Sequence, residues 1–255
     1  MRKLVAALAC RANGARLYGK PLQMLDLERQ INVLEHMIAW IKTEPTISEI
    51  VLGVSEGSEN EPFHEIARTH GLKSIRGDQI DVLKRLIQCG EAAGATDIFR
   101  TTTESPFTWF EAIVPAWERH LSLKNDITGI GVVPDGAGFE MITLETLQRC
   151  HRNGDSRHRS ELCTLYVREH RDEFQVDVIL PPKALRRPEL RLTIDYPEDL
   201  VFCRRIVEHF RDLAPRIPMA KIIEFIDSRP DLQALVQPYV QAEPWYDDET
   251  EEKQA

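Results

Sequence analysis

The chain has 255 residues and a formal net charge of −9, with 42% hydrophobic and 29% charged residues. This length suits one large α/β domain, or a domain with a small appendage. The composition lacks the bias of disordered or fibrous chains. The acidic charge argues against a general nucleic-acid binder, which normally carries a basic footprint. We therefore expect a globular protein that meets any anionic ligand with locally placed Arg and Lys.

No run approaches the roughly 20 apolar residues that a membrane span needs. The apolar run at residues 4–10 is too short for a secretory signal. A cytoplasmic protein with no membrane partner is therefore expected. The cysteines are scattered and lack metal-ligand spacing, so we expect them to be reduced and structural. They are Cys10, Cys89, Cys150, Cys163 and Cys203.

Strand and helix patterns alternate along the first hundred residues. Four apolar runs are expected to be strands: residues 3–9, 49–55, 72–75 and 96–102. Three amphipathic stretches between them are expected to be helices: residues 24–42, 59–71 and 78–94. Strands that alternate with helices of this length predict a mostly parallel central sheet flanked by helices.

The pattern changes beyond residue 130. Residues 129–150 read as a strand, a glycine turn, a second strand and a helix, and residues 190–210 as a further strand and helix. The stretch at about 150–190 is rich in Arg, His and Glu, and is interpreted as an arm or dimerisation insertion. Residues 243–255 form an acidic tail.

The loop after the first strand is the first place to look for chemistry, because ligands of α/β sheets gather at the carboxyl ends of strands. It carries three cations, Arg11, Arg16 and Lys20, and two glycines, Gly14 and Gly19, that allow tight turns with backbone N–H groups facing an anion. Two interpretations are open from these residues: a solvated basic loop, or a binding site for a triphosphate.

A resemblance to a known family favours the second interpretation. The loop resembles A-R-x-x-S-x-R-L-x-G-K of the cytidylyltransferases that activate sugar acids, the 3-deoxy-manno-octulosonate and sialate CMP synthetases. The branch of spore coat polysaccharide biosynthesis protein F is more similar still. Its likeness extends over IRGDQIDVLKRL, FRTTTESPF, PDGAGFE and LRLTIDYPEDL. The resemblance implies a glycosyltransferase A-like (nucleotide-diphospho-sugar transferase) α/β fold, as one nucleotidyltransferase domain over residues 1–242.

The resemblance also implies which residues bind the nucleotide. Arg11, Arg16 and Lys20 would hold the triphosphate of CTP, and Arg16 and Lys20 would stabilise charge on the departing pyrophosphate. Asp81 has a competing interpretation as a helix-surface residue. The remaining predicted nucleotide contacts are Ala9, Gly14, Ser55, Arg76, Asp81 and Thr103.

Two acidic residues are candidate Mg²⁺ ligands, because nucleotidyl transfer depends on neutralising phosphate charge. Glu104 stands where the family has Asp in a G-D-x-P pattern, and its extra methylene places the metal further away or inserts a water. Asp195 matches the family's T-x-D-x-P-E-D pattern. Without that match it would be read as a helix N-cap, while Glu198 and Asp199 read as ordinary first-turn acids.

Residues downstream are candidates for binding the acceptor. Glu140 follows the P-D-G turn, and a polar cluster at residues 155–171 aligns Glu161 and Tyr166 with the family, with Arg159 as a further cation. Leu162 replaces a histidine that is usual there. This cluster suits a carboxylate or phosphate on the acceptor, but a solvated helix face or a dimer arm is an equal alternative.

The resulting hypothesis is a Mg²⁺-dependent cytidylyltransferase, a homodimer, that moves CMP from CTP to a sugar acid or phosphorylated small molecule and releases pyrophosphate. One alternative keeps the fold and changes the substrates: a guanylyl- or uridylyltransferase for a sugar phosphate, or a cytidylyltransferase for a phosphonate. Another is a nucleotide-binding partner protein without catalysis, for which Glu104 is the best sequence argument.

Overall fold

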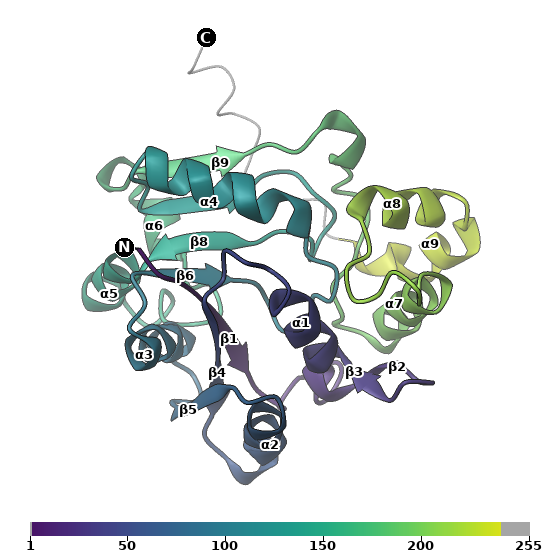
Figure 1. The fold of residues 1–255 in the computed structure, drawn as a ribbon, viewed down its shortest axis with the longest axis horizontal. Helices are drawn as coiled ribbons and strands as arrows, with labels where there is room; N and C mark the ends of the chain where they lie inside the picture. The colour runs from purple at the N-terminus through teal and green to yellow at the C-terminus, as the bar shows by residue number, and fades with distance from the viewer. Residues whose placement is uncertain (1, 241–255) are drawn as a thin grey trace.

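A central sheet of seven strands organises the chain in a computed structural model that describes residues 2–240 (Figure 1). The spatial order is β5-β4-β1-β6-β8-β7-β9, and β8 is antiparallel to both of its neighbours while the others run parallel. The strands are β1 (Leu4–Cys10), β4 (Glu49–Ser55), β5 (Lys73–Gly77), β6 (Asp97–Arg100), β7 (Ile127–Ile130), β8 (Glu140–Thr143) and β9 (Val176–Ile179). The predicted mostly parallel sheet is confirmed.

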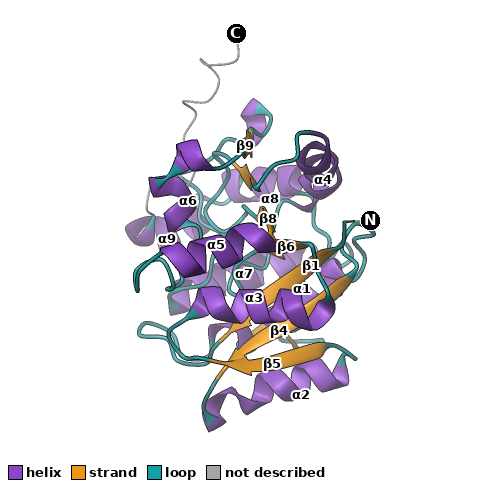
Figure 2. Ribbon diagram, turned by 90° about the vertical axis from the view of Figure 1, so that its left-hand side faces the viewer, coloured by secondary structure: helices purple, strands orange, loops and turns teal. Residues whose placement is uncertain are grey.

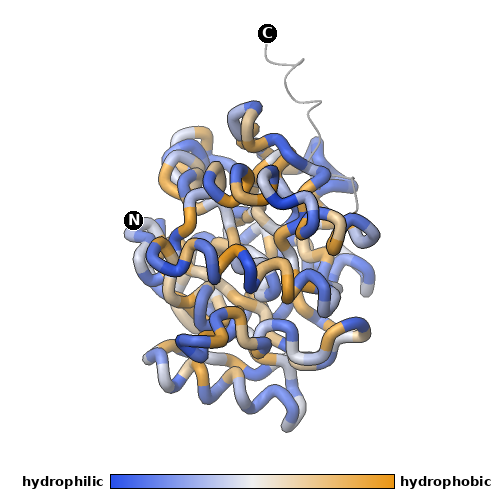
Figure 3. Tube along the Cα trace, turned by 90° about the vertical axis from the view of Figure 1, so that its right-hand side faces the viewer, coloured by the Kyte–Doolittle hydropathy of each residue, from blue (hydrophilic) through white to orange (hydrophobic). Residues whose placement is uncertain are grey.

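Helices cover both faces of this sheet (Figure 2). They are α1 (Val33–Ile41), α2 (Glu61–Thr69), α3 (Val82–Ala93), α4 (Ile113–Ser122), α5 (Leu144–Asn153), α6 (Leu165–Glu169), α7 (Pro197–His209), α8 (Met219–Asp227) and α9 (Pro230–Val236). The strand β1 explains the two layers, because its alternate side chains point to opposite faces. Leu4 and Leu8 pack in the core with α1, α2, α4, α7 and α8, whereas Val5 and Ala7 pack with α3, α5 and α6. Figure 3 shows polar and apolar residues alternating along the outer helices, as one-sided burial requires.

The first predicted helix begins later than its apolar pattern indicated. Residues 24–32 form a hairpin instead, with strands β2 (Met24–Asp26) and β3 (Ile31–Asn32). Asn32 then starts α1: its side chain accepts from the backbone N–H of Glu35 at 2.8 Å, and the Glu35 carboxylate accepts from Asn32 N–H at 3.1 Å. A strand expected near residue 190 is reduced to a single bridge between Asp135 and Arg191.

The stretch at about 150–190 is packed on the body of the chain. It contains α6, and β9 extends the main sheet by pairing with β7. Cys163, Val167 and Phe174 lie buried in the core beside α3. Dimerisation through this stretch stays a prediction, and the acidic tail at 243–255 lies outside the described residues. All five cysteines are buried and free. Among the described residues, no helix has the length and apolarity to cross a membrane.

A buried polar network ties the amino end of the sheet together. Asp97 and His120 have fully buried side chains, 3.2 Å apart between Oδ1 and Nε2. The other ring nitrogen of His120 bonds Thr128 Oγ1 at 2.9 Å, and Arg2 Nε donates to Asp97 at 2.9 Å. Burial raises the pKa of Asp97, but hydrogen bonds from His120 and Arg2 outweigh it and hold that pKa below its ordinary value.

We expect Asp97→Asn to lower the free energy of unfolding at pH 7 by about 3 kcal/mol, because it takes the carboxylate away from Arg2 and from the buried ring of His120. The folded-state pKa of Asp97 is depressed, so its stabilisation is present above the unfolded value of about 3.9 and disappears as the pH falls through the folded value. Urea unfolding at pH 7 and in acid should therefore show a weaker acid dependence in the variant. Glu65→Gln, at an exposed ion pair with Arg68, is the control. Equal acid dependence in Asp97→Asn and wild type would contradict this account.

Candidate active site

The loop after β1 is fastened at both its ends. The backbone N–H of Gly19 donates to the Ala12 carbonyl at 2.7 Å, and Gly19 has a φ of 59°, which favours glycine. The N–H of Ala12 donates to Asn60 Oδ1 at 2.7 Å, and Asn60 Nδ2 donates to the Glu56 carbonyl at 2.9 Å. A Cβ on Gly14 would lie 2.5 Å from the Leu17 carbonyl oxygen, so a side chain at this position would force the loop to change. Asn60, which sequence reasoning missed, joins the loop to the end of β4.

Asn60→Ala should free the first turn of this loop. Asn60 is 2% exposed, so its loss leaves the Ala12 N–H without its side-chain acceptor and removes the 2.9 Å bond to the Glu56 carbonyl, at a cost of about 1–3 kcal/mol. Amide hydrogen exchange should then speed up across residues 11–20. Asn13→Ala is the matched control, because Asn13 makes an exposed contact with Glu59 at 3.0 Å. Equal exchange in both variants would show that Asn60 does not hold the loop.

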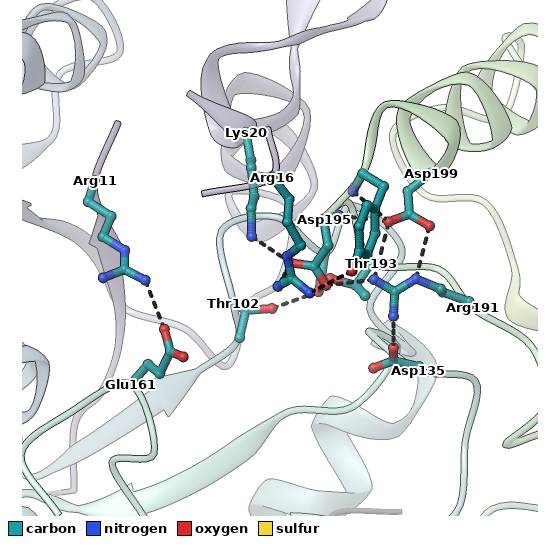
Figure 4. A network of polar contacts seen from close by, with 12 residues as sticks. Arg11, Arg16, Lys20, Thr102, Asp135, Glu161, Arg191, Thr193, Asp195 and Asp199 are labelled. Atoms are coloured by element: carbon teal, nitrogen blue, oxygen red, sulfur yellow. Dashed lines mark hydrogen bonds and ion pairs between the residues drawn. The ribbon is translucent and has the colours of Figure 1, made fainter. Parts of the chain in front are cut away.

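Three cations converge on the carboxylate of Asp195 (Figure 4). Two of them come from the loop: Lys20 Nζ donates to Asp195 Oδ1, and Arg16 Nη2 donates to the same oxygen at 3.2 Å. The third is Arg191, whose Nη2 donates to Asp195 Oδ2 at 2.6 Å. Burial raises the pKa of Asp195, but the ion pairs with Lys20 and Arg191 outweigh it and keep the carboxylate ionised. The structure therefore unites two predicted phosphate-binding residues with the acid that sequence reasoning favoured most.

Asp195 is not the cap of the helix that follows it. Tyr196 is the N-cap of α7, and Asp199 Oδ2 accepts the backbone N–H groups of Asp195 and Tyr196 at 2.8 and 2.9 Å, just before the helix begins. The interpretation of Asp199 as an ordinary first-turn acid is wrong. Its side chain is 1% exposed and is also bonded to Arg191 at 2.9 Å. Asp199 thereby fixes the backbone that carries Asp195.

Arg191 joins the carboxylates around this point. Its side chain is 4% exposed, and Nη1 contacts Asp135 at 2.7 Å while the other nitrogens contact Asp195 and Asp199. The backbone of Asp135 also pairs with the segment that carries Arg191. Its N–H donates to the Leu190 carbonyl at 2.9 Å, and its carbonyl accepts from the Leu192 N–H at 2.7 Å. Sequence reasoning missed Arg191. The only signal was its spacing of four residues before Asp195 within a matched motif.

Glu104 lies beside Asp195 through a backbone contact. The N–H of Ile194 donates to the Glu104 carbonyl at 2.9 Å. Burial raises the pKa of Glu104 above its ordinary value, and the negative charge of Asp195 raises it further. The positive charge of Lys20 lowers this pKa but does not cancel the rise. Among the described residues, no group of three or more His, Cys, Asp or Glu side chains could hold a metal ion. The donor chemistry of the two acids fits Mg²⁺, which is commonly bound by one or two carboxylates together with substrate phosphates and waters.

The predicted nucleotide contacts divide into two groups. Ala9, Ser55 and Thr103 lie at the carboxyl ends of β1, β4 and β6, and Thr103 Oγ1 donates to the Ala9 carbonyl at 3.1 Å. Arg76 and Asp81 are engaged elsewhere. Arg76 pairs with Glu61 on α2. Asp81 caps α3 through Lys84 N–H at 2.8 Å and contacts His151, also at 2.8 Å.

Arg85, from the same motif as Asp81, lies beneath the strand ends instead. Its Nη1 donates to the carbonyls of Cys10 and Gly53 at 3.0 and 3.2 Å, and the residue is 1% exposed.

The predicted acceptor residues are only partly brought together: Arg100 Nη1 contacts the Glu140 carboxylate, and its Nη2 donates to the Glu161 carbonyl at 2.9 Å. Glu140 is buried, bonded to Arg100 at 2.6 Å and to Thr164 at 2.9 Å. Tyr166 is also buried, in the core beside α3. Direct acceptor contact by these two residues is therefore unsupported, because their side chains are occupied inside the fold.

Arg159 and Glu161 differ in their access to the loop. Arg159 Nη2 donates to the carbonyls of His151 and Gly154, at 3.1 and 3.4 Å. Glu161 reaches the loop, where it pairs with Arg11 at 2.8 Å. Figure 4 shows that this pair stands apart from the Asp195 cluster, so Arg11 is separated from Arg16 and Lys20.

Comparison with known proteins agrees with this fold. A cytidylyltransferase structure from Leptospira borgpetersenii serovar Hardjo-bovis superimposes with a TM-score of 0.83 over 97% of this chain and 100% of that one, at 20% identity. The structure of CMP:2-keto-3-deoxy-manno-octonic acid synthetase complexed with CTP gives 0.62 over 81% of this chain and 99% of that one, at 12% identity. No protein-family model matches the chain. The chain therefore has the nucleotide-diphospho-sugar transferase fold of these nucleotidyltransferases, as predicted.

The chain is also similar in sequence to a protein named for polysaccharide biosynthesis. The chain is 25% identical over 235 residues to the spore coat polysaccharide biosynthesis protein SpsF of Bacillus subtilis, covering 91% of this chain and 97% of that protein. The resemblance indicated by the motifs is thus confirmed over nearly the whole chain.

Proposed function

We propose that this protein is a cytidylyltransferase that transfers CMP from CTP to a small anionic acceptor. The observation that carries the proposal is the convergence of Lys20 and Arg16, from the loop after β1, on the carboxylate of Asp195. This places two cations suited to phosphates next to an ionised acid suited to a metal. The relatives supply the choice of nucleotide, since one is a cytidylyltransferase and another is a CMP synthetase complexed with CTP.

In the proposed reaction an acceptor oxygen attacks the α-phosphorus in line and forms a new P–O bond. The bond between the α-phosphorus and its bridging oxygen breaks, and pyrophosphate leaves. Lys20 and Arg16 would stabilise the charge that develops on the pyrophosphate, because cations already held at that position need no reorganisation. Arg191 and Asp199 would keep Asp195 in place. No protein nucleophile is required.

Glu104 and Asp195 would hold Mg²⁺ in this scheme. When bound, the ion would supply neutralisation of phosphate charge and polarisation of phosphate oxygens. Asp195 is kept ionised by its cationic partners, whereas Glu104 has a raised pKa and is the weaker ligand at low pH. The acceptor we propose is a sugar acid or a phosphorylated small molecule.

The proposal is tested by measuring pyrophosphate release from the pure protein with Mg²⁺ and each nucleoside triphosphate in turn. Sugar acids, sugar phosphates and phosphonates are supplied as acceptors. We expect release with CTP and one acceptor class, and its loss on addition of EDTA. Release with GTP or UTP alone would overturn the nucleotide assignment. Tight CTP binding without turnover on any acceptor would instead favour a nucleotide-binding partner protein.

A further inference from the structure

Arg16 rests on a stack of two tyrosines. Its guanidinium carbon lies 4.9 Å from the ring centroid of Tyr196, and Nη1 lies 3.4 Å from the Tyr196 hydroxyl. The ring of Tyr196 is in turn stacked on Tyr239, with centroids 4.0 Å apart and planes inclined by 16°. The stack therefore connects the loop after β1, the start of α7 and the segment that follows α9.

Tyr239 follows helices α8 and α9, which were not predicted from the sequence. Helices α8 and α9 bury Ile222, Ile226 and Leu232 in the core and lie beside α7 (Figure 1). The short turn at Gln237–Tyr239 then brings the tyrosine ring onto Tyr196.

The stack limits the freedom of a side chain that would otherwise move. The Arg16 side chain is 44% exposed, and within residues 2–240 it contacts only Asp195 and Tyr196. A long arginine side chain loses much rotamer freedom when it binds an anion, so a ring that holds it beforehand removes part of that entropy cost. Cation–π contact and aromatic stacking are each strong enough to do this.

We propose that Tyr239 is a positioning residue of the active site: by stacking on Tyr196 it fixes the ring that holds Arg16 for the triphosphate. The inference rests on the proposed function, because it assigns Arg16 to the phosphates. It also makes the C-terminal helices α8 and α9 a functional part of the site, since they place Tyr239.

Calorimetric titration of the pure protein with CTP and with CMP, in Mg²⁺, tests this role. Tyr239→Ala should weaken CTP binding about tenfold, the size of one cation–π or stacking contact. CMP binding should stay unchanged, because CMP lacks the phosphates that Arg16 meets. In an Arg16→Met background, Tyr239→Ala should weaken CTP binding no further, because Tyr239 acts through Arg16.

Two further variants separate positioning from a general loss of structure. Tyr239→Phe keeps the stacked ring and should restore CTP affinity to within about threefold of wild type. Arg229→Met removes another cation–π contact in the C-terminal segment, 5.8 Å over Phe225, and should leave CTP affinity unchanged. Equal weakening of CTP and CMP by Tyr239→Ala, or additive effects with Arg16→Met, would overturn the positioning role. A wild-type protein that binds no CTP would overturn the proposed function itself.

Discussion

Asp195→Asn should lower kcat by at least about a thousandfold, because a metal ligand contributes several kcal/mol of transition-state charge stabilisation. The asparagine keeps the shape of the side chain, and Arg191 retains Asp135 and Asp199 as partners. The fold should therefore survive, with a melting temperature within a few degrees of wild type. Steady-state kinetics of pyrophosphate release, together with a thermal unfolding scan, measure both effects.

Glu145→Gln is the matched control for this substitution. Glu145 is an exposed acid in the first turn of α5, so it represents a helix-terminal carboxylate without a neighbouring cation cluster. Its kcat should equal that of wild type. If Asp195→Asn kept its activity within a few-fold, Asp195 would not be a metal ligand, and its ion pairs with Lys20 and Arg16 would have only a structural role.

Arg191→Met should destabilise the protein and impair the site together. The substitution leaves the buried carboxylate of Asp199 without its cation and releases Asp195 Oδ2, so we expect the free energy of unfolding to fall by about 3–5 kcal/mol. Turnover of the folded fraction should drop as well, because Asp195 loses its fixed orientation. Urea unfolding and kinetics on the same preparation separate the two effects.

Arg187→Met is the control, since Arg187 also joins two acids, Glu189 and Asp227, but at the surface. Its loss should cost about 1 kcal/mol or less. The double variant Arg191→Met/Asp199→Asn should regain part of the lost stability, because it no longer buries an unpaired charge. Equal destabilisation by Arg191→Met and Arg187→Met would contradict a special role for the buried guanidinium.

The strands of the sheet were predicted correctly where a run of apolar residues marks them in the sequence. Residues of β1 and β4 are apolar runs bounded by polar loops, and the order of strands and helices predicts their parallel packing. Sequence reasoning misjudged residues 24–32, because the apolar residues of a short hairpin imitate a helical period. It left out α4, α8 and α9, and it interpreted β9, which the structure places in the main sheet, as part of an arm.

The residues of the candidate site could be predicted only where a sequence motif contains them. The loop cations and Asp195 were found because each lies at a strand end or helix start in a recognisable pattern. Acceptor contact by Glu140 stays a prediction, because the motif shows its place in the chain but not its burial against Arg100. Tyr239 could not be found at all, because its contact with Tyr196 joins residues 43 positions apart without any periodic signal.

The central claim is that the chain transfers a nucleotidyl group, and isotopic labelling of CTP tests it most directly. With the acceptor identified by pyrophosphate release, CTP labelled at the α-phosphorus and CTP labelled at the γ-phosphorus are incubated separately with protein and Mg²⁺. We predict that the α label appears in the acceptor product and the γ label in pyrophosphate. Transfer of the γ label to the acceptor, or its release as inorganic phosphate, would contradict the account.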